Sequence, residues 1–349
     1  MISSNMTASQ KRRFAPCDVA VVILTYSDRW QLLKETLSAA LAQGAGRAIV
    51  VDNCSARDIA GLAGAEFGNA VLVLRSDRNM GSSAGYGLGM KTASQLPGAE
   101  LILLLDDDNK PQPGCLENLC AAFNEKAGAE SLDNFALLAF RDNCPPSADT
   151  IIYSTFLLFH LRGLAAQVKR QIPFLRQSAV KLACRWQRVP WTTYGGFFFH
   201  RGILKRHGLP DARFVLYADD LEYTYRITAA GGGIYFIPEA QIVHTGVSWD
   251  KKVPDKFARR LFVLLKGSDY RIFYQLRNLA YFDSHFLCRS RIMREINRAV
   301  YLGLLSVLGL CTGKLKRLRL VWKAVHRGEQ GLLGESPDFP LEQPACSKH

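Results

Sequence analysis

The stretch that decides the fold is LILLLDDDNKP, residues 101–111. Its first five residues are all apolar, which is typical of a strand that is buried on both faces of a parallel sheet. Three consecutive aspartates follow, and adjacent carboxylates repel one another and resist burial. The repulsion requires a compensating partner at the end of this strand.

Strand and helix patterns alternate around this stretch. Apolar, β-branched runs predict three further buried strands, at 19–26, 47–53 and 69–76. Helical patterns follow the strands, at about 27–43, 83–95 and 113–126. This alternation predicts an α/β fold with a doubly wound, mostly parallel sheet and helices on both faces. Ligands of such sheets bind beyond the carboxyl ends of the strands, where Tyr26, Asp52 and Asp106–Asp108 fall.

Composition places the chain among globular proteins, because its 349 residues are 48% hydrophobic and 21% charged. The nine cysteines are scattered without a CxxC pair. That pattern argues against a zinc ribbon or a secreted disulfide framework and favours a reducing cytosol. The first apolar run is too short and too strand-like for a signal peptide.

The net charge of +13 is unevenly distributed. Residues 151–210 contribute +10 and residues 251–327 contribute +14, which leaves −11 for the rest of the chain. The chain is therefore an acidic body with two basic segments. Those segments favour an anionic partner.

The aspartates at 106–108 are typical ligands of a hard divalent cation, whose shell the oxygens of a bound ligand complete. Mg²⁺ or Mn²⁺ holding a diphosphate fits best, because the metal offsets both the carboxylate repulsion and the phosphate charge. The alternative is a solvated acidic turn after a strand.

Two further stretches hold candidate site residues. The loop DRNMGSSAGYGLGMKTA (77–93) lacks the GxGxxG spacing of a dinucleotide-binding motif. Its small residues would allow the backbone to approach a sugar or phosphate closely. The alternative is an ordinary loop that leads into a helix. In 217–246, Asp219 and Asp220 open a predicted helix and a strand ends at His244. We interpret Asp219 as a helix cap or a partner of the helix dipole, and His244, on the residues alone, as structural. Glu222 and Arg226, four residues apart, are expected to form a structural ion pair.

Together these stretches resemble the family-2 glycosyltransferases with a GT-A fold. Seven motifs in the family's order carry the resemblance over about residues 15–250: VVILTYSDR, VVDNCS, RNMGSSAGYGLGM, LLLDDDNKPQPG, YGGFFFHR, GLPDARFVLYADDLEYTYR and IPEAQIVH. The triple aspartate, the acid pair followed by His244, and Trp249-Asp250 look most like galactofuranosyl- and rhamnosyltransferases.

The resemblance implies a role for each matching residue. For the donor, it implies that Thr25, Tyr26 and Asp52 contact the nucleoside, that Asn79 and Gly81 contact the diphosphate or sugar, and that Asp107 contacts the donor sugar. Asp106, Asp108 and His244 would bind the metal. Trp191 and Trp249 would contact the acceptor. Asp220 would be the general base, with Asp219 as the alternative, because the chain has Asp-Asp where the family more often has Glu-Asp. The donor would be of the UDP-galactofuranose or dTDP-rhamnose type, and the acceptor a lipid-linked or cell-envelope glycan.

The chemistry agrees with those roles. Mg²⁺ or Mn²⁺ would neutralise the leaving diphosphate, and one base would take the proton of the acceptor hydroxyl. One base without a second carboxylate nucleophile implies a single inverting displacement. A two-carboxylate hydrolase is the chemical rival, but it has no use for a metal motif beside a nucleotide pocket.

The basic segments predict contact with a membrane. The stretches 155–186, 291–311 and 314–327 are rich in Leu, Lys and Arg, and the longest uncharged run, 299–313, is too short to cross a bilayer. Such basic amphipathic helices lie at a membrane surface, here expected to be the inner face of the cell membrane. The alternatives are helices packed on the core or at an oligomer contact. Nucleic acid is a weaker option, because no recognised binding motif is present.

We therefore expect a disordered tail over 1–15, a catalytic domain over 16–250 with a basic amphipathic insertion at 151–190, a basic helical region over 251–327, and a flexible tail over 328–349. The favoured function is a membrane-surface glycosyltransferase in the cytoplasm. The alternative is a non-catalytic, basic membrane- or nucleic-acid-binding protein on the same fold. The oligomeric state stays open.

Overall fold

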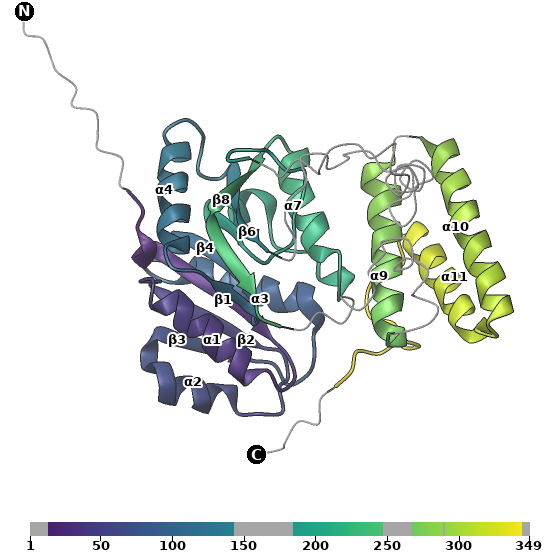
Figure 1. The fold of residues 1–349 in the computed structure, drawn as a ribbon, viewed down its shortest axis with the longest axis horizontal. Helices are drawn as coiled ribbons and strands as arrows, with labels where there is room; N and C mark the ends of the chain where they lie inside the picture. The colour runs from purple at the N-terminus through teal and green to yellow at the C-terminus, as the bar shows by residue number, and fades with distance from the viewer. Residues whose placement is uncertain (1–12, 143–183, 247–266, 289, 344–349) are drawn as a thin grey trace, which may run out of the picture.

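A computed structural model describes residues 13–142, 184–246, 267–288 and 290–343 (Figure 1). The strands are β1 (Val19–Thr25), β2 (Arg47–Asp52), β3 (Val71–Arg75), β4 (Leu101–Asp106), β5 (Asn109–Pro111), β6 (Phe135–Arg141), β7 (Phe197–His200) and β8 (Gly233–His244). The helices are α1 (Trp30–Leu41), α2 (Ile59–Phe67), α3 (Gly81–Gln95), α4 (Cys115–Ala127), α6 (Gly202–His207), α7 (Asp219–Ala229), α9 (Asp269–Phe282), α10 (Arg291–Cys311) and α11 (Leu315–Glu329). Short helical turns are η1 (Pro16–Asp18), η2 (Gly68–Ala70), η4 (Ala212–Phe214) and η6 (Asp283–Leu287).

These strands form one sheet in the order β3-β2-β1-β4-β7-β6-β8-β5. The first four strands are all parallel, and β6 and β8 are parallel to each other, while β7 and β5 run antiparallel to their neighbours. The prediction of a mostly parallel sheet is confirmed. Every predicted strand is present: β1, β2 and β4 are apolar runs that bury both faces, whereas β3 at the edge of the sheet is only partly buried.

Helices cover both faces of the sheet, as predicted (Figure 1). On one face, alternate residues of β1 pack with α1, α2 and α4 in one apolar cluster. On the other face, the remaining residues of β1 pack with α3, α6 and α7 in a second cluster. The register places the carboxyl ends of three strands at one edge, with Thr25 opposite Asp52 and Leu24 opposite Asp106.

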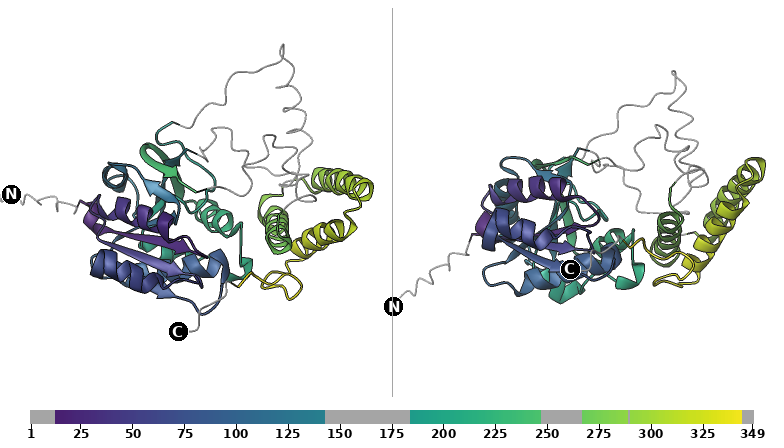
Figure 2. Two further views of the ribbon diagram at one scale, coloured as in Figure 1. Left: turned by 60° about the horizontal axis from the view of Figure 1, so that its bottom comes forward. Right: turned by 90° about the horizontal axis from the view of Figure 1, so that it is seen from below.

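Three helices beyond the sheet, α9, α10 and α11, have an apolar cluster of their own. In both further views they lie together at one end of the molecule, with α9 nearest the sheet domain (Figure 2). Val215 from the loop before α7 and Leu341 from the C-terminal segment also belong to this cluster. These helices are therefore joined to the sheet domain at the loop that leads into α7.

The C-terminal segment differs from the expected flexible tail. Residues 330–343 return from α11 over α9, with the ring of Phe339 stacked 4.4 Å from that of Phe273 and Leu341 only 7% exposed. Burial of these two apolar side chains accounts for the packed course of a segment whose polar composition predicts otherwise. The predicted insertion at 151–190 and the tail at 1–15 lie mostly outside the described residues.

Candidate active site

Two adjoining cavities open at the carboxyl ends of the strands. The first, of about 570 Å³, is lined by the ends of β1 and β4, by the start of α3 and by three residues of α9. The second, of about 430 Å³, contains the start of α7. Both are lined by Ser82, Asp106, Leu216, Tyr217 and Gln275. The predicted triple aspartate and the predicted Asp219–Asp220 pair therefore face one continuous region.

The negative charge of the aspartates after β4 is offset by Arg29, the residue that immediately precedes α1. Arg29 forms ion pairs with Asp107, at 3.0 Å, and with Asp108. Thr25 donates its hydroxyl to Asp107 Oδ2 at 2.8 Å. Burial raises the pKa of Asp107 to about 7, although Arg29 and the Thr25 hydroxyl act in the opposite direction. This carboxyl group is buried and held by neighbours, unlike a solvated acidic turn.

Asp108 and His244 approach each other, as the metal prediction requires. His244 Nδ1 lies 3.2 Å from Asp108 Oδ1, and Asn109 donates its side-chain amide to the same oxygen at 2.8 Å. The pairing of β5 with β8 brings this about, because it sets Asn109 opposite His244. Oxygen and imidazole ligands are chemically suited to Mn²⁺ or Mg²⁺.

The third predicted metal ligand, Asp106, lines the same cavity but has other partners. Tyr86 donates its hydroxyl to Asp106 Oδ1 at 2.8 Å, and Arg141 lies 3.6 Å from Asp106 Oδ2. Within the described part of the chain, no group of three or more His, Cys, Asp or Glu side chains is gathered so that it could hold a metal ion. The side chains thus bring two of the predicted ligands together, and the metal site stays a prediction.

The Asp219–Asp220 pair opens α7, but Asp219 is not the helix cap that the sequence suggested. The N-cap position belongs to Ala218, in a left-handed conformation with φ of 61°. Asp219 is instead buried, with 2% of its surface exposed, and accepts a hydrogen bond from the Ser82 hydroxyl at 2.9 Å. The cap interpretation is wrong because the helix begins one residue earlier than a cap at Asp219 requires, which places Asp219 in the first helical turn, the position of a dipole partner.

Burial changes the acidity of both carboxyl groups. It raises the pKa of Asp219 above the ordinary aspartate value, and the adjacent charge of Asp220 raises it further. Burial also raises the pKa of Asp220, with a contribution from Asp106 in the same direction and an opposing one from Arg141. A carboxylate with a raised pKa is a stronger base than an ordinary one, which suits proton abstraction.

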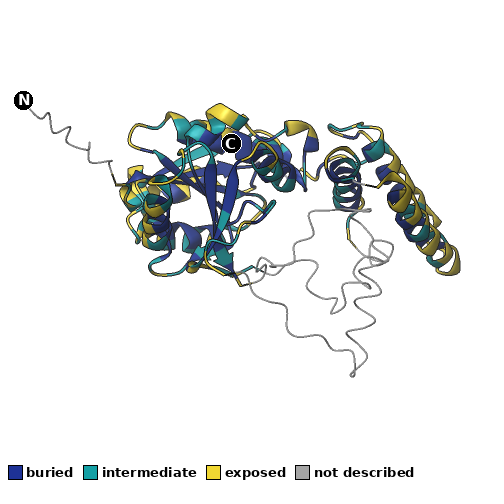
Figure 3. Cartoon of the chain, turned by 90° about the horizontal axis from the view of Figure 1, so that it is seen from above, coloured by how far each residue is buried: buried dark blue, intermediate teal, exposed yellow. Residues whose placement is uncertain are grey.

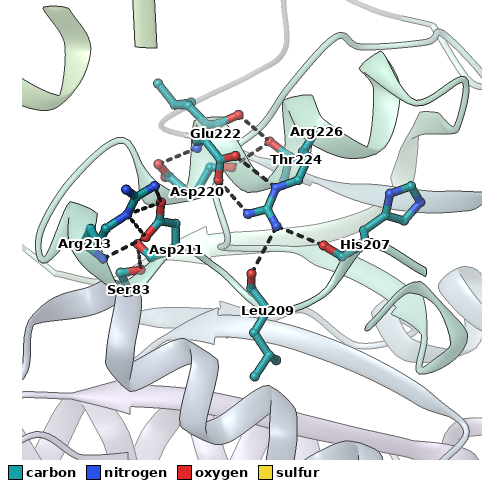
Figure 4. Close-up of polar contacts among 10 residues, drawn as sticks. Ser83, His207, Leu209, Asp211, Arg213, Asp220, Glu222, Thr224 and Arg226 are labelled. Atoms are coloured by element: carbon teal, nitrogen blue, oxygen red, sulfur yellow. Dashed lines mark hydrogen bonds and ion pairs between the residues drawn. The ribbon is translucent and has the colours of Figure 1, made fainter. Parts of the chain in front are cut away.

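The rest of α7 is anchored by further polar contacts, one of which, from the Thr224 hydroxyl, also reaches the carbonyl of Asp220 at 2.7 Å (Figure 4). Arg226 forms the predicted ion pair with Glu222, at 2.7 Å, and donates to the carbonyl of His207 at 2.9 Å. Thr224 donates its hydroxyl to the carbonyl of Thr192 at 2.9 Å. Ser83 of α3 donates to the carbonyl of Asp211 at 2.8 Å. Arg226 and Thr224 thereby fix the helix that carries the aspartates to two neighbouring segments, and the Ser83 bond ties α3 to the loop that precedes α7.

The predicted nucleoside residues divide into two groups. Thr25 and Tyr26 line the first cavity, whereas Asp52 is fully buried and accepts a hydrogen bond from the Ser55 amide at 2.8 Å. The neighbouring Asn53 lines the cavity in its place and donates to Asn79 Oδ1 at 2.9 Å. The side-chain alternation of the strand end explains the shift by one residue.

Asn79 and Gly81 also line the first cavity, as predicted. Gly81 has φ of 80°, and a Cβ at this position would lie 2.0 Å from the carbonyl oxygen of Val215. No side chain fits there, so the glycine permits α3 to begin against the loop before α7.

The predicted acceptor residues do not both fall on described residues. Trp191 packs edge-on against Tyr225 and Phe282, each at a ring distance of 6.0 Å, while Thr193 and Tyr194 of the same segment line the second cavity. Trp249 lies outside the described residues.

Sequence reasoning missed the part of the site that comes from the C-terminal region. Tyr270, Arg271 and Gln275 of α9 line the first cavity. The carbonyl of Glu342 accepts hydrogen bonds from the Tyr26 hydroxyl and the Asn79 side chain, both at 3.0 Å. These residues are more than 160 positions from the ends of β1 and β4 that line the same cavity, and their own sequence carries no motif that signals the contact.

Comparisons with known proteins concern the family and the fold. Residues 16–266 match the family described as Glycosyltransferase like family 2. The fold is similar to the crystal structure of GalNAc-T7 with UDP, GalNAc and Mn²⁺ (TM-score 0.52, 14% identity), covering 80% of this chain and 55% of that chain. It is also similar to S. aureus TarS 1–349 in complex with UDP-GlcNAc (TM-score 0.47, 14% identity), covering 90% of this chain and 92% of that one. The chain thus spans about half of the GalNAc-T7 structure, and the comparison with curated protein sequences finds no match. The family match and the sheet together confirm the predicted GT-A fold.

Proposed function

We propose, because the chain belongs to the Glycosyltransferase like family 2, that it moves a sugar from a nucleotide-sugar to an acceptor hydroxyl by a single inverting displacement. The observation that carries the proposal is the adjacency of the two cavities. One holds the aspartates after β4, and the other holds Asp219 and Asp220. A donor in the first cavity would present its anomeric carbon toward an acceptor beside the carboxylate pair.

The residues of this chain would divide the work. Tyr26, Asn53 and Asn79 would bind the nucleoside, and Asp220 would take the proton of the acceptor hydroxyl. Asp106, Asp108 and His244 would hold Mg²⁺ or Mn²⁺. The metal, when bound, would neutralise the charge that develops on the leaving diphosphate. Two of these ligands already lie 3.2 Å apart, and the diphosphate oxygens would complete the shell.

The donor that the sequence motifs favour is of the UDP-galactofuranose or dTDP-rhamnose type, and the acceptor is a lipid-linked or cell-envelope glycan. A screen of nucleotide-sugars for metal-dependent donor hydrolysis tests both the activity and the donor type. Release of nucleoside diphosphate with Mn²⁺ but not with EDTA is the expected result. Full turnover in excess EDTA would contradict the metal role, and no turnover with any donor would contradict the proposal.

We also propose that the protein works at the cytoplasmic face of a membrane. None of the helices in the described ranges is long and apolar enough to cross a bilayer. The outer side of α10 instead exposes apolar side chains at helical spacing, and Figure 3 shows its exposed surface at the end of the molecule. Ile292 is 78% exposed, Val307 62% and Leu310 65%. Exposed cations follow this helix, at Lys314, Lys316 and Arg319, and they complement an anionic lipid surface.

Vesicle pelleting tests this location. Wild-type protein should pellet with vesicles that contain anionic lipid and be released by high salt or mild detergent, and Val307→Glu with Leu310→Glu should lower the bound fraction. Leu62→Glu on α2 is the matched control, because it places the same charge on an exposed leucine of the sheet domain. Equal vesicle binding by all three proteins would rule out this face, and loss of a dimer in light scattering by the α10 variant would indicate an oligomer contact instead.

A further inference from the structure

The loop that delivers Asp219 and Asp220 adopts an unfavourable backbone conformation. Val215, Tyr217 and Ala218 have φ of 66°, 67° and 61°. Such angles are uncommon for residues with a Cβ, and they are sterically worst for β-branched or bulky side chains. They persist only where the surroundings hold them in place.

A single asparagine of α9 contacts the loop at three carbonyl groups. Asn278 Nδ2 lies within hydrogen-bond distance of three carbonyls of the loop, those of Phe214 at 2.7 Å, Leu216 at 2.8 Å and Tyr217 at 2.9 Å, and its two hydrogens are shared among them. The side chain is fully buried. An amide in this position replaces the backbone partners that an irregular loop lacks.

Its neighbour, Arg277, is also fully buried and orients the asparagine. Arg277 Nε donates to Asn278 Oδ1 at 2.9 Å, and Nη2 donates to the carbonyl of Phe214 at 3.1 Å. Nη1 donates to the carbonyl of Gly334 in the C-terminal segment. Burial lowers the pKa of Arg277 to about 10. The hydrogen bonds described for this guanidinium end on neutral oxygens, which is a costly environment for a charge.

The loop that these two residues hold forms the wall between the cavities. Leu216 and Tyr217 line both cavities, and the carbonyl of Val215 accepts a hydrogen bond from the Ser83 amide at the start of α3. A shift of the loop would therefore move Asp219 and Asp220 relative to the aspartates after β4.

We infer that Arg277 and Asn278 of α9 are positioning residues, which fix the Asp219–Asp220 pair against the donor cavity through the backbone of residues 213–218. This inference rests on the proposed function of the pair. The C-terminal helical region would then have two roles: α9 would position the catalytic loop, and α10 would contact the membrane.

Asn278→Ala and Arg277→Lys test the inference. Asn278→Ala removes the donor to three carbonyls, and Arg277→Lys keeps the charge but loses the forked geometry. We expect kcat to fall about 10- to 100-fold in Asn278→Ala, because displacement of a reacting group by about 1 Å can cost that much. Arg277→Lys should retain more activity. Hydrogen exchange of the amides of residues 215–221 should accelerate in both variants, while that of β1 and β4 stays unchanged.

Leu305→Ala is the control for a general loss of stability. Leu305 is fully buried in the apolar cluster of the same three helices but belongs to α10. It should lower Tm without lowering kcat at a temperature well below unfolding. If Asn278→Ala left both kcat and loop exchange unchanged, or if Leu305→Ala lowered kcat equally, the positioning role would be wrong. If the wild type transferred no sugar, the proposed function would fail, while the exchange measurement would still decide whether the two residues hold the loop.

Discussion

The two groups of aspartates in this protein have opposite environments. Asp107 and Asp108, after β4, are met by the guanidinium of Arg29 and, at Asp108, by His244. Asp219 and Asp220, at the start of α7, receive their hydrogen bonds from neutral groups, the Ser82 hydroxyl and the Leu221 amide. The first group is built around positive charge, and the second group is buried without direct contact to it.

Because their environments differ, aspartates in one site can have two different roles, binding charge and transferring a proton. A neighbouring cation opposes protonation of a carboxylate, and burial favours it. At Asp107 burial outweighs Arg29 and raises the pKa to about 7, so the two groups differ in their charged contacts and not in the direction of these shifts. We therefore assign charge binding at the donor to the first group and proton transfer at the acceptor to the second. The predictions below test that division.

The largest expected effect is the loss of transfer in Asp220→Asn. Asparagine keeps the size of the side chain and can still accept the hydrogen bond from the Leu221 amide. It cannot take a proton, so kcat should fall about 10²- to 10⁴-fold. Steady-state transfer to an acceptor, measured with saturating donor, gives the value.

Asp219→Asn is the control for that variant. Its asparagine Oδ1 can still accept the Ser82 hydroxyl, and kcat should fall far less than in Asp220→Asn. Loss of transfer in Asp219→Asn with retained activity in Asp220→Asn would move the base to the preceding residue. Full activity of both variants would show that neither aspartate of α7 is the catalytic base.

A smaller effect is expected from pH. Burial raises the pKa of Asp220, and the base is active only when it is deprotonated. The rate should therefore fall as pH decreases, about tenfold per pH unit below the pKa, and the fall should begin above the ordinary aspartate value of about 3.9. A profile of kcat against pH measures this limb. A rate that stayed flat down to pH 4 would show that no raised carboxyl group controls the reaction.

The smallest effect concerns stability. Because burial raises the pKa of Asp219 in the folded protein, its neutral form favours folding, and that stabilisation is lost as pH rises through the folded-state pKa. Asp219→Asn should therefore raise the free energy of unfolding at pH 8 by about 1–2 kcal/mol, and by less at pH 5. Urea unfolding at both pH values provides the comparison. A destabilised variant at pH 8 would mean that the ionised carboxylate is well solvated.

Much of the sheet domain could be predicted because its signals are local. A short continuous apolar run such as Leu101–Leu105, between helical patterns, favours a strand buried on both faces, and in a parallel sheet the aspartates that follow it lie at the edge where ligands bind. The same logic placed His244 at a strand end, and the pairing of β5 with β8 then brought it to Asp108.

The remainder of the site depends on contacts between distant segments. Arg29, Arg141 and Asn278 are ordinary residues in the sequence, and only the fold brings them to the aspartates or to the loop before α7. Asp52 and Asp219 were misjudged by local rules, because a one-residue difference at a strand end or a helix start redirects a side chain.

The division between the two aspartate groups is tested most directly by calorimetric titration of UDP with Mn²⁺ into wild-type protein, Asp108→Asn and Asp220→Asn. The account predicts that Asp108→Asn weakens metal-dependent binding about tenfold or more, because a ligand of the bridging metal is lost. It also predicts that Asp220→Asn binds nearly as the wild type does, because its role appears only in the transition state. Equal affinities in wild type and Asp108→Asn, or an equal loss in both variants, would contradict the division.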